Sequence, residues 1–162
     1  MPRPIVAVLA ALIASTVPAA AQTATTFGGL KADVKAPVEV SSDALSVNQA
    51  DGSATFTGNV VIGQGAMRLS AAEVKVVYAG QGQNRIQSLT ATGGVTLVSG
   101  EDAAEAKQAV YEVESGEVTL TGDVIVTRGE NVLSGERMVV DLAKGTAAVE
   151  GRVRSVFRPG AD

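Results

Sequence analysis

One octapeptide motif occurs twice in this chain, as TFTGNVVI at residues 55–62 and as TLTGDVIV at residues 119–126. The copies belong to a longer match, in which residues 51–78 align without gaps with residues 115–142. Two weaker copies, TATGGVTLVSG and AAVEGRVRSVF, follow the same plan, so the glycine of the motif recurs at positions 58, 93, 122 and 151. These spacings of 35, 29 and 29 residues indicate an array of supersecondary units that bury one shared core by stacking.

Hydrophobic and polar residues alternate within each unit, which is the period of a β-strand. In the first copy Phe56 and Ile62 alternate with threonine and asparagine up to a glycine-rich turn at 63–65. The segment EDAAEAKQAV at 101–110 has a helix-permissive composition, but it occupies the place that strands hold in the strong copies. We expect a strand or an edge there. No window shows a convincing helical period, so the sequence predicts an all-β fold.

The repeated glycine stands inside a strand-like run rather than between runs. A glycine there removes side-chain packing and adds backbone freedom, so it usually marks a bulge, a bend or a close approach of two backbones. Four such glycines at equivalent places predict that every hairpin bends at about the same level. Stacked bent hairpins give a folded-over sheet with a concave apolar face and a polar outer face. A role as simple turn residues is the poorer interpretation, because strand-forming residues flank the glycine.

The first 21 residues have the features of a secretory signal peptide. Arg3 gives a positive start, residues 5–17 are apolar, and three alanines at 19–21 give a small-residue cleavage pattern. An uncleaved anchor is the less favoured alternative, since the apolar run is shorter than the ~20 residues that span a bilayer. The predicted organisation is a signal peptide at 1–21, a flexible mature N-terminus at 22–35, one β-domain at 36–159 and a short tail at 160–162.

Composition argues against catalysis and against several classes of partner. The chain has no histidine and no cysteine, and its formal net charge is −4. Its positive residues are scattered singly, which argues against nucleic acid as a partner. The one dense acidic cluster, Glu101, Asp102 and Glu105, lacks the spacing of a calcium loop and is interpreted as a solvated turn. The sequence therefore predicts a protein that is not an enzyme and that uses no metal and no cofactor.

Four segments of the sequence, taken together, are more specific than the repeat alone. They are APVEVSSDALSV (36–47), ATFTGNVVIGQGAMRLSAAEVKV (54–76), YEVESGEVTLTGDVIVTRGENVLSGERMVVDL (111–142) and EGRVRSVFRP (150–159). These segments resemble the periplasmic lipopolysaccharide-transport proteins of the LptA (OstA-like) family, and the resemblance covers nearly all of the chain from Ala36 to Pro159. Among the members of that system, a cleavable signal and the absence of a barrel extension favour the soluble periplasmic component.

The resemblance implies a twisted β-jellyroll of stacked antiparallel strands, open at both ends. It implies that the acyl chains of lipid A, the lipid part of lipopolysaccharide, lie in the apolar interior. Copies would join head to tail, and edge strands would dock on the inner-membrane-anchored and outer-membrane transport proteins, forming a periplasmic bridge for outer-membrane assembly. The alternatives are a purely structural periplasmic adaptor with a closed core and, less favoured, an extracellular hydrolase or sugar-binding β-solenoid.

The inward positions of the alternating strands supply an apolar lining, which needs no catalytic residue to bind a lipid. At any single position ordinary core packing is the competing interpretation. By the family pattern, Val38, Val95, Tyr111 and Val113 are the preferred lipid contacts, and Val74 and Val140 are further inward positions. The predicted lipid-binding set is Val38, Val40, Leu45, Val47, Phe56, Val60, Ile62, Leu69, Val76, Leu89, Val95, Leu97, Tyr111, Val113, Leu120 and Val124.

The two ends of the stack are predicted to pair with other chains. An open stack leaves edge strands whose unpaired N–H and C=O groups recruit further strands. Joining the first strand of one copy to the last strand of the next would be head-to-tail β-augmentation. The alternative is that the flanking charges Arg152, Arg154 and Arg158 keep the last edge solitary. The predicted partner edges are Pro37, Val38, Val40, Val153 and Val156.

Overall fold

The computed structural model describes residues 30–80 and 85–158. The predicted signal peptide, the greater part of the predicted 22–35 segment and the predicted tail lie outside the described residues. Within the described ranges, no helix has the length and apolar character needed to cross a membrane. The strands of these ranges are β1 (Glu39–Ser41), β2 (Ala44–Asn48), β3 (Ser53–Gln64), β4 (Met67–Tyr78), β5 (Ile86–Ser99), β6 (Asp102–Glu112), β7 (Glu117–Arg128), β8 (Asn131–Asp141), β9 (Thr146–Glu150) and β10 (Arg154–Val156).

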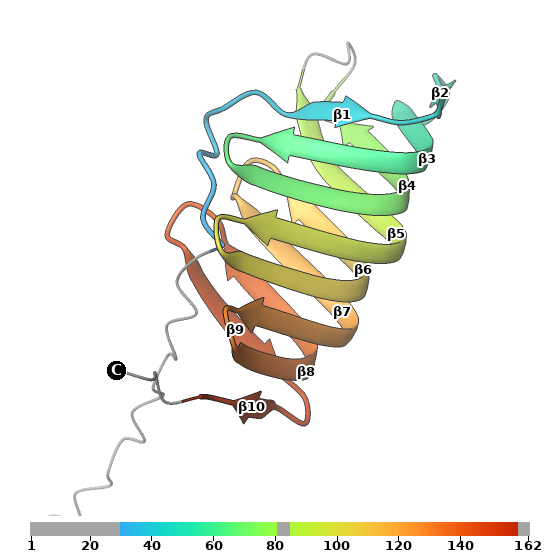
Figure 1. Cartoon of the computed structure of the whole chain (residues 1–162). Helices are drawn as coiled ribbons and strands as arrows, with labels where there is room; N and C mark the ends of the chain where they lie inside the picture. Colours follow the sequence, from blue (N-terminus) through green and yellow to red (C-terminus); the bar gives the residue numbers. More distant parts are fainter. Residues whose placement is uncertain (1–29, 81–84, 159–162) are drawn as a thin grey trace, which may run out of the picture.

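All of these strands pair antiparallel in a single sheet that does not close on itself. Each long strand pairs with its neighbours in sequence, from β3 through β8. At one end β1 and β2 pair with the two parts of β3, and at the other end β9 and β10 pair with the two parts of β8. Figure 1 shows the resulting stack, with β1 at the top and β10 at the bottom. The predicted all-β stack of antiparallel strands, open at both ends, is confirmed.

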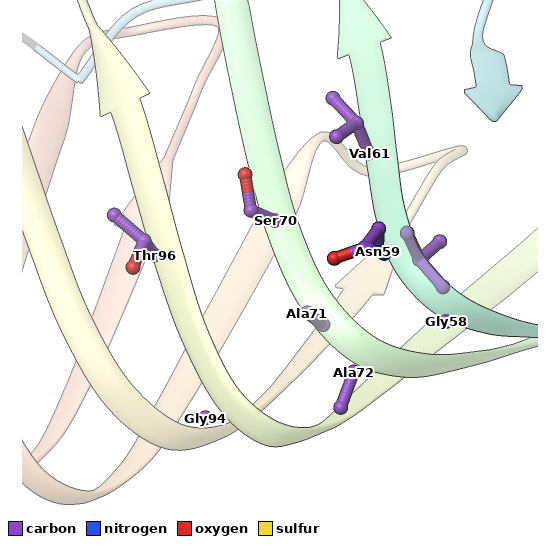
Figure 2. Close-up of a pocket in the computed structure, with 9 residues that line it drawn as sticks. Gly58, Asn59, Val61, Ser70, Ala71, Ala72, Gly94 and Thr96 are labelled. Carbon is purple, nitrogen blue, oxygen red and sulfur yellow. The ribbon is translucent and has the colours of Figure 1, made fainter. Parts of the chain in front are cut away.

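Each long strand bends near its middle, at the level of the repeated glycine. The strand ladder shifts register at residues 58–59 of β3, 93–94 of β5 and 122–123 of β7. All four repeated glycines have positive φ, between +78° and +84°. The residue after each of them also has a positive φ. Figure 2 shows Gly58, Ala72 and Gly94 at the turning points of the ribbons. The predicted bulge within a strand is confirmed at Gly58, Gly93 and Gly122, whereas Gly151 lies in the bend between β9 and β10.

Space as well as dihedral angle requires glycine at these bends. A Cβ atom at Gly93 would lie 2.6 Å from the Cβ of Ala72, and one at Gly122 would lie 2.8 Å from the Cβ of Lys107. A Cβ atom at either glycine would therefore displace the neighbouring strand.

The bends divide the sheet into two halves that face each other. The first half contains β1, β10 and residues 60–64, 67–71, 95–99, 102–106, 124–128 and 131–135. The second half contains β2, β9 and residues 53–57, 73–77, 88–92, 108–112, 117–121 and 137–141. The hydrophobic core lies between the halves. Leu69 and Leu97 come from the first half and Leu89 and Leu120 from the second, and each is at most 1% exposed.

Strand β6 is formed by the segment of ambiguous composition, and the prediction of a strand there is confirmed. It lies between β5 and β7 rather than at an edge. Ala104 and Ala106 are buried while Glu105 and Lys107 are exposed, which is the two-residue period of a strand. Alanine at the inward positions leaves room between the halves for larger side chains from other strands.

Residues 30–35, which the sequence analysis placed in a flexible segment, are packed against the sheet instead. Leu30 is 1% exposed and Ala32 is 6% exposed. The backbone N–H of Ala32 donates to the carbonyl oxygen of Leu142 at 3.0 Å. In Figure 1 this stretch climbs along the side of the stack before it reaches β1.

Candidate functional site

The apolar interior between the two halves of the sheet is the candidate site. It holds ten of the sixteen predicted lining residues, each at most 2% exposed: Val60, Ile62, Leu69, Val76, Leu89, Val95, Leu97, Tyr111, Leu120 and Val124. Strand alternation brings these side chains to one face, and the bend folds that face onto itself. The interior therefore runs along the stack from β3 to β8.

Four further predicted residues lie at the margin of this interior. Val38, Val40, Phe56 and Val113 are partly buried and pack against the core. Val38 directly precedes β1, Val40 lies in β1, and Phe56 lies in the part of β3 that pairs with β2. Of the four preferred contacts, Val95 and Tyr111 thus lie deep in the interior and Val38 and Val113 lie at its margin.

The prediction that Leu45 and Val47 line a buried interior is wrong for the isolated chain. Their side chains are 56% and 49% exposed. Both lie in β2, which pairs only with β3 among the described strands and ends the stack. The alternating pattern identifies a face of a strand, but burial needs a second layer over that face.

Several residues that complete the interior stand outside the predicted lipid-binding set. Met67, Val118, Met138 and Leu142 are fully buried, as is Leu30 from the segment before the sheet. The strand period could have identified Val118 and Met138, because they stand two residues from predicted lining positions or their repeat equivalents. No local pattern marks Leu30, whose burial depends on distant parts of the chain.

A buried polar contact crosses the interior between Gln64 and Tyr111. Gln64 ends β3 in the first half and Tyr111 lies in β6 in the second half, and each is 1% exposed. The Tyr111 hydroxyl donates to Gln64 Oε1. Burial raises the pKa of Tyr111, although the hydrogen bond to Gln64 lowers it in part. The tyrosine is therefore neutral at physiological pH and acts as a hydrogen-bond donor.

Asp102 is buried at the start of β6, in contrast to the solvated turn expected for the acidic cluster. Its carboxylate is 2% exposed, and its nearest ionic partner is Arg128, with Nε 3.4 Å from Oδ1. Neither carboxylate oxygen has a hydrogen-bond partner among the described residues. Burial raises the pKa of Asp102, Arg128 lowers it, and Glu101 raises it further. Among the described residues, no group of three or more metal-ligating side chains is gathered.

The outer surface carries two shallow depressions at repeat-equivalent places beside the bends. Figure 2 shows the first, with Asn59, Val61, Ser70 and Thr96 around it. The second is lined by the corresponding residues of the later copy, which include Asp123, Ile125, Ser134 and Glu136. Both lie outside the interior, so they follow from the repeat geometry of the bends rather than from the candidate site.

The predicted partner edges lie at the two ends of the stack. Val153 and Val156 are 51% and 52% exposed, and Pro37 is exposed before β1. Arg152 forms an ion pair with Glu136 at 2.8 Å, and Arg158 forms one with Glu130 at 3.5 Å. Two of the three arginines near β10 are therefore engaged by carboxylates of the same chain.

Comparison with known proteins relates this chain to a known family. The family model described as "LptA/(LptD N-terminal domain) LPS transport protein" matches residues 39–146. An uncharacterized protein of Rhizobium meliloti (strain 1021) is 31% identical over 117 residues, which cover 68% of this chain and 62% of that protein. The chain thus spans less than two thirds of the length of this relative.

A solved structure supports the same fold. The crystal structure of LptH, described as the LptA-homologous periplasmic component of the lipopolysaccharide transport device of Pseudomonas aeruginosa, superimposes with a TM-score of 0.69 at 20% sequence identity. The match covers 79% of this chain and 99% of that one. The bent, unclosed sheet is therefore a β-jellyroll of the LptA type, as predicted. Because the family model matches residues 39–146, more than half of its length, the chain belongs to the family of LptA and LptD N-terminal-domain lipopolysaccharide-transport proteins.

Proposed function

We propose that this protein carries lipopolysaccharide across the periplasm by taking the acyl chains of lipid A between the two halves of its bent sheet. The observation that carries the proposal is the continuous apolar interior from β3 to β8, in a chain of a lipopolysaccharide-transport family. Burial of acyl chains is favourable by ~25 cal/mol per Å² of apolar surface, so aliphatic walls suffice for binding. Val38, Val95, Tyr111 and Val113 are the residues we propose to touch the lipid.

The ends of the stack support a role as a bridge. Exposed large apolar side chains gather there, namely Leu45 and Val47 in β2 and Val153, Val156 and Phe157 at the last strand. Within the described residues, β1 and β10 each pair with a single strand. The ion pairs of Arg152 and Arg158 with their own chain reduce the charge that a docking strand would meet. We propose that these edges join copies head to tail and meet the membrane-bound transport components.

The packed interior favours one alternative, a structural adaptor with a closed core. The deep lining residues are at most 2% exposed, so the described state holds its interior filled by its own side chains. A carrier must open this interior, whereas an adaptor need not.

Native mass spectrometry distinguishes the two functions. The protein, expressed from its full coding sequence and purified, is mixed with lipopolysaccharide or with an ordinary phospholipid. We expect a saturable lipopolysaccharide adduct that Val95→Asp and Val38→Asp abolish. Val61→Asp is the matched control, because it introduces the same charge on the outer face, where Val61 is 36% exposed.

Circular dichroism of every variant shows whether the fold persists. An adduct retained by Val61→Asp and lost by Val38→Asp supports the carrier. A folded wild-type protein that forms no adduct with lipopolysaccharide favours the closed adaptor.

A further inference from the structure

The side of the stack opposite the bends is where the two halves of the sheet end in turns. Turns at 65–66, 100–101 and 129–130 end the first half, and we call these turns and the strand residues that border them the first lip. Turns at 113–116 and 142–145 end the second half, and we call them the second lip. An acyl chain that enters from the side must pass between these lips, because the bends close the other side (Figure 1).

Residues 30–36, here named the strap, lie between the two lips and contact both. On the second lip, the Ala32 N–H donates to the Leu142 carbonyl at 3.0 Å. The side chain of Val34 lies against the turn at Gly116, since a Cβ there would be 3.0 Å from Val34 Cγ1. On the first lip, the Ser99 hydroxyl donates to the Lys31 carbonyl at 2.6 Å.

Gln64 joins the strap to both halves of the sheet. Its Nε2 donates to the carbonyl oxygens of Val34 at 3.1 Å and Ala36 at 3.0 Å. Its Oε1 accepts from the hydroxyl of Tyr111, which belongs to the second half. One buried side chain on the first lip thus connects the first half, the second half and the strap.

The strap places aliphatic side chains in the interior, where the acyl chain of a lipid would place its methylene groups. Leu30 and Ala32 point inward and are buried, while Lys31, Asp33 and Lys35 are exposed. The strap is not part of the strand ladder, and side chains rather than a neighbouring strand satisfy several of its carbonyl groups. A segment held by a few hydrogen bonds opens at lower free energy than a strand paired on both sides.

We propose that the strap is a releasable cover of the lateral opening, and that lipid acyl chains enter the interior when residues 30–36 leave the lips. This inference rests on the proposed lipid-carrier function and explains how a filled interior becomes available. Gln64 and Tyr111 act as the latch, because their hydrogen bonds hold the strap and both halves together.

A reversible disulfide tests the cover directly. A Cβ at Gly116 would lie 3.8 Å from the Cβ of Val34, which is about the mean separation of roughly 3.8 Å in disulfides. The chain has no cysteine of its own, so Val34→Cys with Gly116→Cys can form only this intramolecular bond. The matched controls are the two single variants and the same double variant after reduction, which share any strain of a side chain at Gly116.

We expect the oxidised double variant to take up lipopolysaccharide at least about tenfold less, because apparent affinity scales with the fraction of binding-competent molecules. Reduction should restore uptake. Equal uptake by the oxidised and reduced forms overturns the cover and leaves the carrier function standing. No uptake by the wild type or any folded control overturns the carrier function and the cover with it.

A second variant tests the latch without a covalent bond. Gln64→Leu removes both donors to the strap and the acceptor for Tyr111, so lipid uptake should become faster. Gln108→Leu, the same change at an exposed position of β6, should have no effect. Hydrogen exchange adds an independent readout: the Ala32 amide should lose protection when lipopolysaccharide binds, and retained protection in the loaded protein contradicts the proposal.

Discussion

At the scale of single residues, the repeated glycines decide where the sheet folds over. Gly122 has a φ of +84°, and a Cβ there would lie 2.8 Å from the Cβ of Lys107. Gly122→Ala should destabilise the domain by about 2–3 kcal/mol, because an L-residue with positive φ costs roughly 1–2 kcal/mol and the contact adds to this. Gly100→Ala is the control, since φ is +59° and no atom lies within 4 Å of the added Cβ. Urea denaturation measures both variants, and equal losses would show that the close contact at the bend is unimportant.

Asp102 gives a second residue-scale prediction, which concerns pH. Its pKa is raised in the folded state, mainly by burial, so the folded state binds the proton first as pH falls. As pH falls from neutral through the folded-state pKa of Asp102 toward the ordinary pKa of aspartate, the free energy of unfolding of the wild type therefore rises relative to that of Asp102→Asn. At neutral pH the asparagine variant should be more stable by about 1 kcal/mol, because a buried charge without hydrogen bonds is costly. The lowered pKa of Asp123 beside Lys107 makes stability change with pH in the opposite direction. This contribution is the same in the wild type and in the Asp102→Asn variant. A free-energy difference that does not change with pH would contradict this account.

At the scale of elements, the sequence was sufficient for the long strands and their bends but not for the ends or the strap. Alternation and glycine act locally, so β3 to β8 and the bulge at Gly58 could be predicted from neighbouring residues alone. Leu45 follows the same alternation yet is exposed, because burial depends on a layer that β2 lacks. Leu30 has no local signal, since its burial and the contacts of Gln64 with the strap join residues far apart in the chain.

The last strand carries the element-scale prediction on assembly. Successive N–H groups of an edge strand point alternately toward its partner and outward. Of Ser155→Pro and Val156→Pro, one therefore removes a donor from the pairing of β10 with β8, and the other removes a donor from the free edge. The latter should weaken self-association with little change in melting temperature. Light scattering over a range of concentrations measures the mass, and an unchanged mass in both variants would exclude β10 as the joining edge.

At the scale of the whole molecule, the stack is nearly one-dimensional. At the level of the backbone, each strand lies close only to the strands that it pairs with in the ladder, as in a repeat protein whose stability is a sum of units and their interfaces. Folding over at the bends adds side-chain packing between the halves but creates no new strand neighbours. A strand at the centre of the stack therefore has a neighbouring strand on each side, whereas a strand at either end has one on a single side.

This architecture predicts that the same kind of truncation acts globally at the centre and locally at the end. Leu97→Ala removes a fully buried side chain of β5 and should cost about 2–5 kcal/mol, lowering hydrogen-exchange protection in all the long strands. Val149→Ala, at a half-buried position of β9, should lower protection in β9 and the adjoining part of β8 while β3 to β6 keep theirs. Native-state hydrogen exchange of both variants measures the pattern. If Val149→Ala reduced protection uniformly, the domain would unfold as one unit, and its ends could not rearrange independently to accept a partner strand.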